Sequence, residues 1–543
     1  MQEFFAHSLI KPGTVELRAY QKSIAESVLR AGNTLVVMPT ALGKTVIAAI
    51  VAAHVLAKNK NSKVLFLAPT KPLAMQHQKS FQRIMNIPEN QITLLTGALN
   101  KKKRWDVWDN AVIIAATPQT IQNDLENGRI DLKDVALLVV DEAHRCVKDY
   151  SYVSVALAYK KQAEKPLILA LTASPGSERE KIDEVCRHLG IGNIELRTNE
   201  SDDVAQYMHG IETNQIMVEL PEEFIEIRDL LEGFMLEQLD FFKKIGMVRK
   251  GATSKISRKL LIMLQARISM QLKKPRKNPI YFQAASKIAA LLKISHANTL
   301  LETQGISALQ DYWNRMLEKL QDADAPKALK YALGHPAIQG AIEKTQKLIA
   351  QGKEHPKLQR LAELLRKEFE KNPKGKAIVF NHYRDSVKNV VEYLQKFPEI
   401  KPLRFVGQAT KGEKDKGMSQ EEQAGALEAF KEGTYNTIVA SSVAEEGLDI
   451  PSVDLVIFYE PVPSEIRTIQ RRGRTGRFAN GNVHILLARN TQDEAYHWSA
   501  VNKEKKMHKR IRQLSEDLQA ASKNKKIVRR RKWQSKQMTL KEF

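Results

Sequence analysis

Short apolar runs alternate with longer helical patterns over residues 15–200 of this 543-residue chain. Five of the runs are almost continuously apolar: "TLVVMP", "KVLFLAP", "AVIIAAT", "ALLVVDE" and "PLILALTAS". Strands that are apolar on both faces and separated by helices are typical of a parallel sheet with helices on each side. The pattern returns after residue 375 in "KAIVFN", "PLRFVG", "NTIVASS", "DLVIFYE" and "VHILLAR". The chain is therefore predicted to form two α/β domains.

Between these two regions the strand signal disappears. The stretches "FIEIRDLLEGFMLEQLDFF" and "ALQDYWNRMLEKL" place apolar residues at helical spacing. We therefore expect an α/β domain at 1–204, an all-helical insert at 205–350 and a second α/β domain at 351–500. The last segment, 501–543, contains the basic run "KNKKIVRRRKWQSKQ" and is expected to be a flexible tail.

The formal net charge of +23 indicates a polyanionic partner, and nucleic acid is the first candidate. The segment 243–277 contains twelve Lys or Arg and no acid, so the insert is predicted to offer a basic face that binds branched nucleic acid. The predicted contacts on this face are Lys255, Arg258, Lys273, Lys274, Arg276 and Lys277. The alternative is a solvated helical face over a core.

Other whole-chain features narrow the class of protein. Two cysteines, Cys146 and Cys186, are too few for a disulfide framework or a zinc site of their own. The N-terminus lacks a basic segment followed by an apolar stretch, so no signal peptide is expected. The longest helix-like apolar run, "VIAAIVAAHVLA", is too short to cross a bilayer. We expect a cytoplasmic, nucleoid-associated protein without a membrane partner.

The stretch "VVMPTALGKT", residues 36–45, predicts a phosphate-binding loop between a strand and a helix. Lys44 would neutralise the β- and γ-phosphates of ATP, and the Thr45 hydroxyl would hold Mg²⁺. Met38 stands where the general pattern has glycine. The cofactors expected from this loop are ATP and Mg²⁺.

Two further stretches complete a predicted hydrolytic site. "LLVVDEAHR" places Asp141 and Glu142 at the end of a buried strand, where Asp141 would coordinate Mg²⁺ and Glu142 would take the proton from the attacking water. "IQRRGRTGR", residues 469–477, carries Arg474 and Arg477 around compact glycines. A guanidinium that reaches the γ-phosphate from a neighbouring domain is an arginine finger. The alternatives are an acidic helix cap for the DE pair and a generic basic loop for the arginines.

These motifs, in this order, resemble the DEAH-type helicases of superfamily 2. "LRAYQ", "PTALGKT", "APTKPLA", "TPQT", "DEAHR", "LTASPG", "VFNHYR", "SSVAEEGLDIP" and "QRRGRTGR" match its successive motifs along nearly the whole chain. The resemblance implies two RecA-like domains and nucleotide contacts from Arg18, Gln21, Pro39, Thr40, Ala41, Leu42, Gly43, Lys44, Thr45, Asp141, Gly447 and Asp449. It implies a catalytic role for Gln470 and nucleic-acid contacts from Thr70, Lys71, Thr117, Gln119 and Ser442.

Related helicases usually have glycine at the position of Ala41. If that position needs a positive φ, alanine would be strained there. Strain at Ala41 would favour a protein with little turnover.

The residues of these motifs, together with the helical insert, are most similar to those of archaeal Hef and its FANCM-type relatives. RIG-I-like RNA sensors are the second candidate. Membership implies an ATP-dependent motor on forked or branched DNA, as at stalled replication forks and recombination intermediates. Two alternatives stay open: an ATP-gated nucleic-acid-binding scaffold and a double-stranded RNA ATPase. Hef-like proteins often carry a nuclease domain after the helicase, and these 543 residues contain no ERKxxxD-like pattern, so a nuclease is a candidate partner.

The final residues, "QMTLKEF", have the Q-x-x-L-x-x-F spacing of segments that dock on the sliding clamp PCNA. One helical turn would bring Leu540 and Phe543 onto one face as a hydrophobic plug, and Gln537 would add hydrogen bonds. A frayed end with two exposed apolar residues is the alternative.

Overall fold

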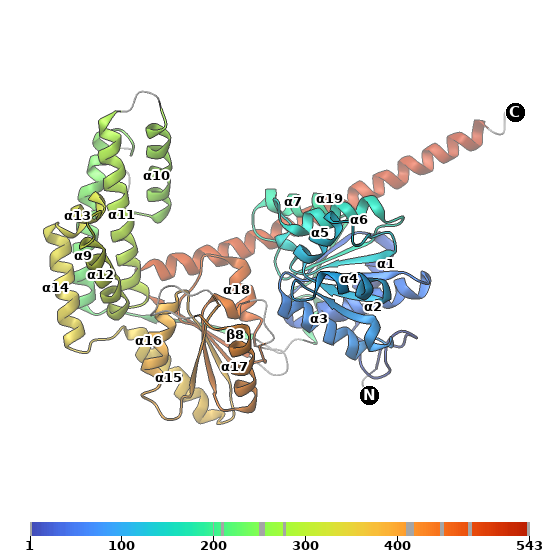
Figure 1. The fold of residues 1–543 in the computed structure, drawn as a ribbon, viewed down its shortest axis with the longest axis horizontal. Helices are drawn as coiled ribbons and strands as arrows, with labels where there is room; N and C mark the ends of the chain where they lie inside the picture. Colours follow the sequence, from blue (N-terminus) through green and yellow to red (C-terminus); the bar gives the residue numbers. More distant parts are fainter. Residues whose placement is uncertain are drawn as a thin grey trace.

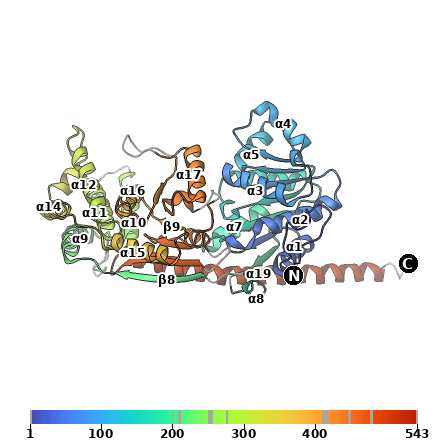
Figure 2. The same cartoon turned by 90° about the horizontal axis from the view of Figure 1, so that it is seen from below.

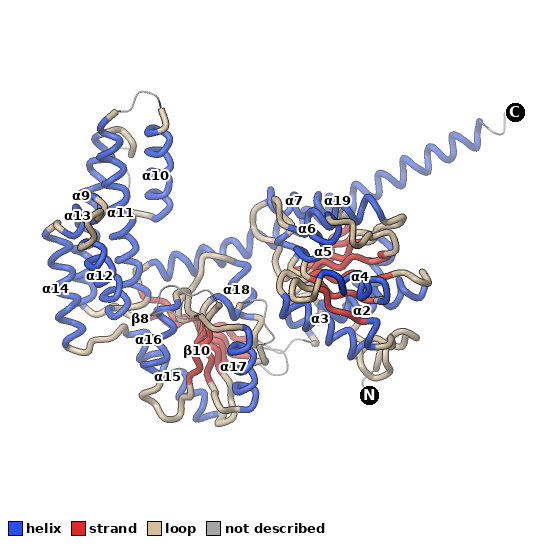
Figure 3. The backbone as a smooth tube through the Cα atoms, viewed as in Figure 1, coloured by secondary structure: helices blue, strands red, loops and turns tan. Residues whose placement is uncertain are grey.

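The structure is a computed structural model that describes residues 3–198, 200–207, 211–248, 256–274, 278–408, 417–445, 450–475 and 481–539. Figure 1 shows two α/β domains, a helical insert that rises from the second of them, and a long C-terminal helix. Figure 3 separates the two sheets from the all-helical insert. The predicted fold class, two RecA-like parallel-sheet domains with a helical domain between them, is confirmed.

Domain 1 is a parallel sheet in the order β3-β4-β2-β5-β6-β1-β7. Its strands are β1 (Thr34–Val37), β2 (Lys63–Leu67), β3 (Ile92–Leu95), β4 (Ile113–Ala116), β5 (Val135–Val140), β6 (Ile168–Thr172) and β7 (Asn193–Leu196). Its helices are α1 (Ala19–Ala31), α2 (Lys44–Lys58), α3 (Lys71–Ile84), α4 (Lys101–Asn110), α5 (Pro118–Glu126), α6 (Ser151–Gln162), α7 (Arg179–Leu189) and α8 (Asp202–Ala205). Neighbouring residues of a strand point to opposite faces of the sheet. Leu35 and Val37 pack in the hydrophobic core on one face, and Val36 packs in the core on the other.

The five apolar runs correspond to β1, β2, β4, β5 and β6, as predicted. The pattern did not reveal β3 and β7, the two strands at the sheet edges. Both have partly exposed positions, since only the first and last residues of β3 and only Ile194 of β7 are buried. An edge strand is solvated on one side and lacks the continuous apolar run on which the prediction depended.

Domain 2 has a parallel sheet in the order β10-β11-β9-β12-β13-β8. Its strands are β8 (Ile211–Val218), β9 (Ala377–Phe380), β10 (Pro402–Phe405), β11 (Thr437–Ala440), β12 (Leu455–Phe458) and β13 (Gly481–Ala488). Its helices are α15 (Pro356–Lys371), α16 (Arg384–Leu394), α17 (Gln420–Glu432) and α18 (Glu465–Arg472). The expectation that 205–350 is entirely helical is wrong at β8, which pairs with β13 along its whole length. The strand "IETNQIMV" mixes polar and apolar residues at a sheet edge, so it carries little strand signal.

The insert begins after β8. It contains α9 (Glu222–Lys244), α10 (Arg258–Leu272), α11 (Pro279–Thr303), α12 (Ile306–Leu320), α13 (Lys327–Leu333) and α14 (Pro336–Ala350). Its core surrounds the fully buried Trp313, whose indole donates to the Thr345 hydroxyl at 3.3 Å. A buried ion pair between Lys357 and Asp493, with Lys357 also donating to the Tyr459 carbonyl, lies in domain 2 next to the end of α11. The insert is thereby fixed to domain 2 through polar contacts as well as apolar ones.

The last helix, α19 (Gln492–Thr539), leaves domain 2 and runs along domain 1, beneath both domains in Figure 2. Met507 and Ile511 are fully buried in a core of domain 1, and Leu514 and Leu518 pack beside them. The first part of segment 501–543, which was expected to be a flexible tail, is therefore a helix packed on domain 1. These four apolar residues follow one another at spacings of four, three and four, so they lie on one face of the helix. This apolar face is enough to pack an otherwise charged segment against domain 1. Along the described ranges, no helix is both long and apolar enough to cross a membrane.

Candidate nucleotide and nucleic-acid sites

The phosphate loop connects β1 to α2 through a short 3-10 helix, Thr40–Leu42, and Gly43. Gly43 has φ 72° and ψ 46°, the left-handed region that glycine tolerates without strain. A Cβ atom on Gly43 would lie 2.7 Å from the Gln21 side-chain nitrogen, so the position also requires the absence of a side chain. Because the loop opens directly into α2, its backbone N–H groups point to the place where a phosphate would bind.

Ala41 belongs to the short 3-10 helix Thr40–Leu42, and within this loop Gly43 takes the left-handed conformation. The expected effect of Ala41 on turnover stays a prediction.

Helix α1 supports the loop from behind. The Tyr20 hydroxyl donates to the Leu42 carbonyl at 2.9 Å, and the Gln21 amide donates to the same carbonyl at 3.2 Å. Arg18 pairs with Glu16 at 2.9 Å and lies over the Tyr207 ring. Gln21 is thus placed beside the phosphate loop, as its expected nucleotide role requires, and it also holds the shape of that loop.

The two expected magnesium ligands, Thr45 and Asp141, come together at the ends of β1 and β5. Both contact His77 of α3: His77 Nε2 lies 2.9 Å from Asp141 Oδ2, and His77 Nδ1 lies 3.3 Å from Thr45 Oγ1. Burial would raise the pKa of Asp141, but the hydrogen bond from His77 and the charge of Lys44 outweigh burial, and this pKa is lowered. A hydroxyl and an ionised carboxylate are the hard oxygen ligands that Mg²⁺ prefers.

Within the described part of the chain, no group of three or more His, Cys, Asp or Glu could hold a metal by itself. Magnesium on Thr45 and Asp141 would therefore need nucleotide phosphates and water to complete its coordination, as is usual for Mg²⁺ in nucleotide sites. Lys44 is buried, and its ammonium donates to the Met38 carbonyl at 3.3 Å. The residues present fit a magnesium–nucleotide complex.

Glu142 has φ 47° and ψ 50°, a left-handed conformation that is uncommon for a side chain with a Cβ atom. Its Oε2 lies 3.3 Å from His144 Nδ1, yet among the described residues this buried oxygen accepts no hydrogen bond. His144 Nδ1 instead contacts the Thr172 hydroxyl at 3.2 Å. A buried carboxylate oxygen without a partner is costly, and a water at the site would satisfy it. This geometry suits the expected general base.

The arginine loop of domain 2, which includes the described residues 469–475, faces the phosphate loop of domain 1. The Thr40 hydroxyl lies 3.4 Å from the Gly473 carbonyl, across 433 positions of sequence. Arg474 is buried and donates to the Glu445 carbonyl at 2.6 Å, and Gln470 is buried on α18. The remaining expected residues of this group, Gly447, Asp449 and Arg477, lie outside the described residues.

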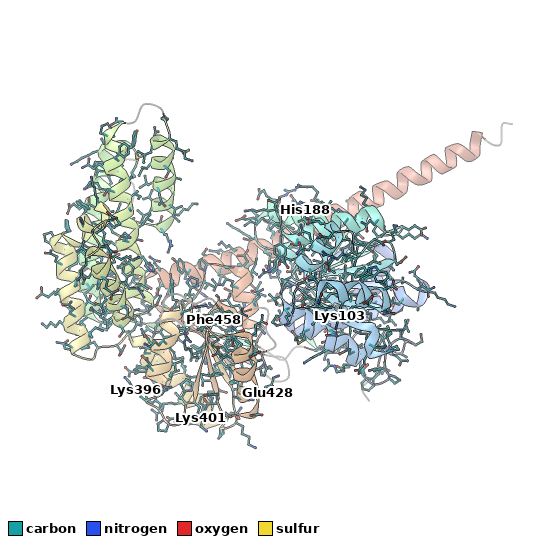
Figure 4. All side chains as sticks on the ribbon, viewed as in Figure 1. Lys103, His188, Lys396, Lys401, Glu428 and Phe458 are labelled. Atoms are coloured by element: carbon teal, nitrogen blue, oxygen red, sulfur yellow. The ribbon has the colours of Figure 1, made fainter. Side chains whose placement is uncertain are left out.

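The sequence interpretation missed Arg471, which fixes the arginine loop to domain 2. Its guanidinium is fully buried, donates to Glu445 Oε1 at 2.9 Å and to the Glu460 carbonyl at 2.8 Å, and lies over the rings of Phe380 and Phe458. Figure 4 labels Phe458 within domain 2. The sequence did show a run of arginines in this segment. Its local pattern could not tell which of these arginines would be buried and which exposed.

A cavity of about 1120 Å³ lies between domain 1, the arginine loop and α19. Pro39 and Thr40 line it from the phosphate loop and Arg472 from the arginine loop. Arg472 also pairs with Glu504 of α19 at 2.5 Å. The cavity therefore places α19 beside both loops of the nucleotide site.

Three expected nucleic-acid residues follow parallel strands: Thr70 after β2, Thr117 after β4 and Ser442 after β11. Thr70 and Thr117 are the N-caps of α3 and α5, and Ser442 begins a short 3-10 helix. Lys71 is half-buried at the start of α3, and Gln119 is exposed on α5. In the sheet order of domain 1, β2 adjoins β5 and β4 adjoins β2, so these strand ends lie on the side of β5 away from β1.

Of the basic residues expected on the insert, Arg258, Lys273 and Lys274 are described, and all three are exposed at the ends of α10. Helix α10 lies on the side of the insert that faces domain 1 (Figure 1). Arg258 lies near Tyr383 of domain 2, where burial raises the pKa of Tyr383 and the charge of Arg258 opposes that rise. The other expected residues, Lys255, Arg276 and Lys277, lie outside the described residues. At the chain end, Gln537 belongs to α19, whereas Leu540 and Phe543 are not described.

Comparison with protein families gives three matches along the chain. The DEAD/DEAH box helicase family matches residues 18–182, and the helicase conserved C-terminal domain matches 356–479. A family described as "Putative ATP-dependent RNA helicase, helical bundle" matches 223–353, which agrees with α9 to α14. The matches imply ATP use by this chain.

Among curated proteins, "Putative ATP-dependent RNA helicase MJ1505" of Methanocaldococcus jannaschii is 40% identical over 512 residues, or 94% of this chain and 63% of that protein. The ATP-dependent DNA helicase mph1 of Neurospora crassa is 36% identical over 503 residues, or 88% of this chain and 42% of that protein. The chain thus spans less than two thirds of the length of either relative.

The crystal structure of the Pyrococcus furiosus Hef helicase domain superposes with a TM-score of 0.69. It is 44% identical in sequence, and the match covers 89% of this chain and 98% of that chain. The likeness extends over both α/β domains and the insert, so this chain belongs to the Hef-type helicases of the DEAD/DEAH box class.

Proposed function

We propose that this chain is an ATP-dependent helicase or translocase that acts on forked or branched DNA. The observation that carries the proposal is the contact of Thr40 in the phosphate loop with Gly473 in the arginine loop. A nucleotide bound to one loop would lie at the boundary of both domains, so hydrolysis would change how the domains fit together. Such a change is what a motor converts into movement along a strand.

In the proposed reaction, Lys44 neutralises the β- and γ-phosphates, and Thr45 and Asp141 would hold Mg²⁺. The metal would supply positive charge that stabilises the negative charge developing on the transferred phosphoryl group. Glu142 orients the attacking water and accepts its proton, a role supported by its buried oxygen that accepts no hydrogen bond from the described residues. Arg474 and Arg477 supply positive charge from domain 2, and Arg474 would have to exchange its present bond to the Glu445 carbonyl for the phosphate.

For the nucleic acid, we propose that the helix N-termini at Thr70, Thr117 and Ser442 bind phosphates of one strand. Free N–H groups at helix starts favour anions regardless of base sequence, as a translocase requires. The basic ends of α10 would hold a second arm of the fork. The name of the Neurospora relative supports DNA, whereas that of the Methanocaldococcus relative supports RNA as the second candidate.

The deciding experiment measures steady-state ATP hydrolysis without nucleic acid and with forked DNA, linear duplex DNA or double-stranded RNA. Glu142→Gln is the matched variant, and it should bind ATP like the parent but lose about 10²–10⁴-fold in turnover. Stimulation by forks above linear duplex supports the proposal, and stimulation by RNA alone would support the RNA-dependent ATPase. Fork binding that depends on ATP, with equally slow turnover in parent and variant, would support the scaffold.

Two partners remain proposals on sequence grounds: a sliding clamp at Gln537, Leu540 and Phe543, and a nuclease. Calorimetry of a 523–543 peptide with the host's clamp tests the first. Equal binding by a peptide with Leu540→Ala and Phe543→Ala would show that the spacing does not mark a docking segment.

A further inference from the structure

We infer that His77 is a positioning residue for magnesium: it orients both protein ligands of the metal, Thr45 and Asp141. The inference rests on the proposed use of Mg-ATP. His77 lies in α3, outside the phosphate loop and the DE pair, and no residue pattern marked it.

The geometry of His77 is that of a bridge. Its two ring nitrogens contact Asp141 Oδ2 at 2.9 Å and Thr45 Oγ1 at 3.3 Å. The residue is only 7% exposed, and its ring packs on Phe66 of β2 with centroids 4.1 Å apart. Packing against Phe66 restricts the rotation of the imidazole, so the ring presents both nitrogens in fixed directions.

The protons of the bridge can be assigned from the chemistry of the partners. An ionised carboxylate only accepts, so Nε2 donates its hydrogen to Asp141. A ring that carries its hydrogen on Nε2 presents Nδ1 as an acceptor, and the Thr45 hydroxyl can donate to it. The Thr45 hydrogen is thereby directed toward His77, which leaves the oxygen lone pairs available for a metal. His77 therefore fixes the carboxylate of Asp141 and orients the hydroxyl of Thr45 for the metal.

The bridge also connects the metal ligands to the expected nucleic-acid edge. His77 lies six positions after Lys71, the first residue of α3, so about 9 Å of rigid helix separates them. Thr70 caps the same helix. One element thus holds the imidazole at the nucleotide site and a helix N-terminus at the nucleic-acid edge.

The test measures equilibrium binding of a non-hydrolysable ATP analogue while Mg²⁺ is titrated, and repeats the measurement in a chelator. The variants are His77→Ala and His77→Gln, with Phe81→Leu as the matched control. Phe81 is buried on the same helix and also packs on Phe66, but it has no contact with Thr45 or Asp141 among its described interactions. Thermal unfolding of each variant is measured in parallel.

His77→Ala should raise the half-saturating Mg²⁺ concentration about 10- to 100-fold, as is typical when a ligand loses its outer partner. Binding in chelator should not change. His77→Gln should recover most of the loss, because one amide offers an acceptor and a donor. An unshifted magnesium dependence in His77→Ala, or an equal shift in Phe81→Leu, would overturn the role of His77 while leaving the proposed function intact. A parent that binds no nucleotide at any Mg²⁺ concentration would refute the proposed function as well.

Discussion

Gly473→Ala should slow ATP turnover through one steric contact. Gly473 has φ −68° and ψ 6°, which alanine adopts without strain, so the backbone itself tolerates the change. The new Cβ atom would overlap with Thr40 Oγ1 and lie 3.2 Å from Thr40 Cβ. Ordinary contacts begin at 3.4 Å, so the Thr40 hydroxyl would have to turn away from Gly473 and the two loops would have to separate.

Both changes act on the nucleotide site, because the two loops carry the phosphate-binding residues and the arginines. Misplacement by about 1 Å can cost about 10²-fold in rate, so we expect a loss in kcat of about 10-fold, with about 10²-fold as the upper bound. The assay is nucleic-acid-stimulated ATP hydrolysis, with thermal unfolding to show that each domain remains folded. Thr40→Ala removes the clashing oxygen, so Gly473→Ala combined with Thr40→Ala should turn over like Thr40→Ala alone.

Two results would refute this reasoning. If Gly473→Ala hydrolysed ATP like the parent, the contact with Thr40 would not belong to the working state. If the double variant were as slow as Gly473→Ala, the loss would come from some place other than Thr40.

Three further changes test other parts of the structure. Arg471→Ala should lower the free energy of unfolding by about 3 kcal/mol in calorimetry, because it removes a fully buried guanidinium that pairs with Glu445 and donates to the Glu460 carbonyl, although Arg467 still pairs with Glu445; a loss below about 1 kcal/mol would contradict this. Burial raises the pKa of Glu302 to about 7 from 4.5, so the unfolding free energy should fall as pH rises through that window, on the order of 1.4 kcal/mol per unit. Glu302→Gln should gain stability over the parent across the same window, and a pH-independent difference would count against it. The double variant Lys273→Gln, Lys274→Gln should weaken fork binding. The slope of the logarithm of the binding constant against the logarithm of the salt concentration should fall by about 0.9 for each phosphate that the protein no longer binds. An unchanged slope would mean that both side chains are only solvated.

Local sequence patterns were sufficient to predict the elements that carry the chemistry. The phosphate loop and the DE pair are each a strand followed by a few residues, so their local pattern predicts both the element and its function. In a parallel sheet the carboxyl ends of all strands meet at one edge, which is why Lys44, Thr45, Asp141 and Glu142 were expected together. The structure confirms that their strands, β1 and β5, end at the same edge.

Local pattern was least informative where a segment is only partly buried. The edge strands β3, β7 and β8 lack a continuous apolar run, and the start of 501–543 looked like a basic tail. In α19 the docking stripe consists of a few apolar residues among many charges, and its partner is a surface of domain 1 that the tail sequence cannot reveal.

Which distant side chains meet at the site became clear only from the folded chain. His77 is 32 positions from Thr45 and 64 from Asp141, and Thr40 is 433 positions from Gly473. A histidine on one face of a helix or a glycine after an arginine has the same local pattern whether it faces solvent, a core or a ligand. The outcome depends on how whole elements pack against each other, because side-chain contacts act over a few ångströms while periodicity describes only neighbours along the chain.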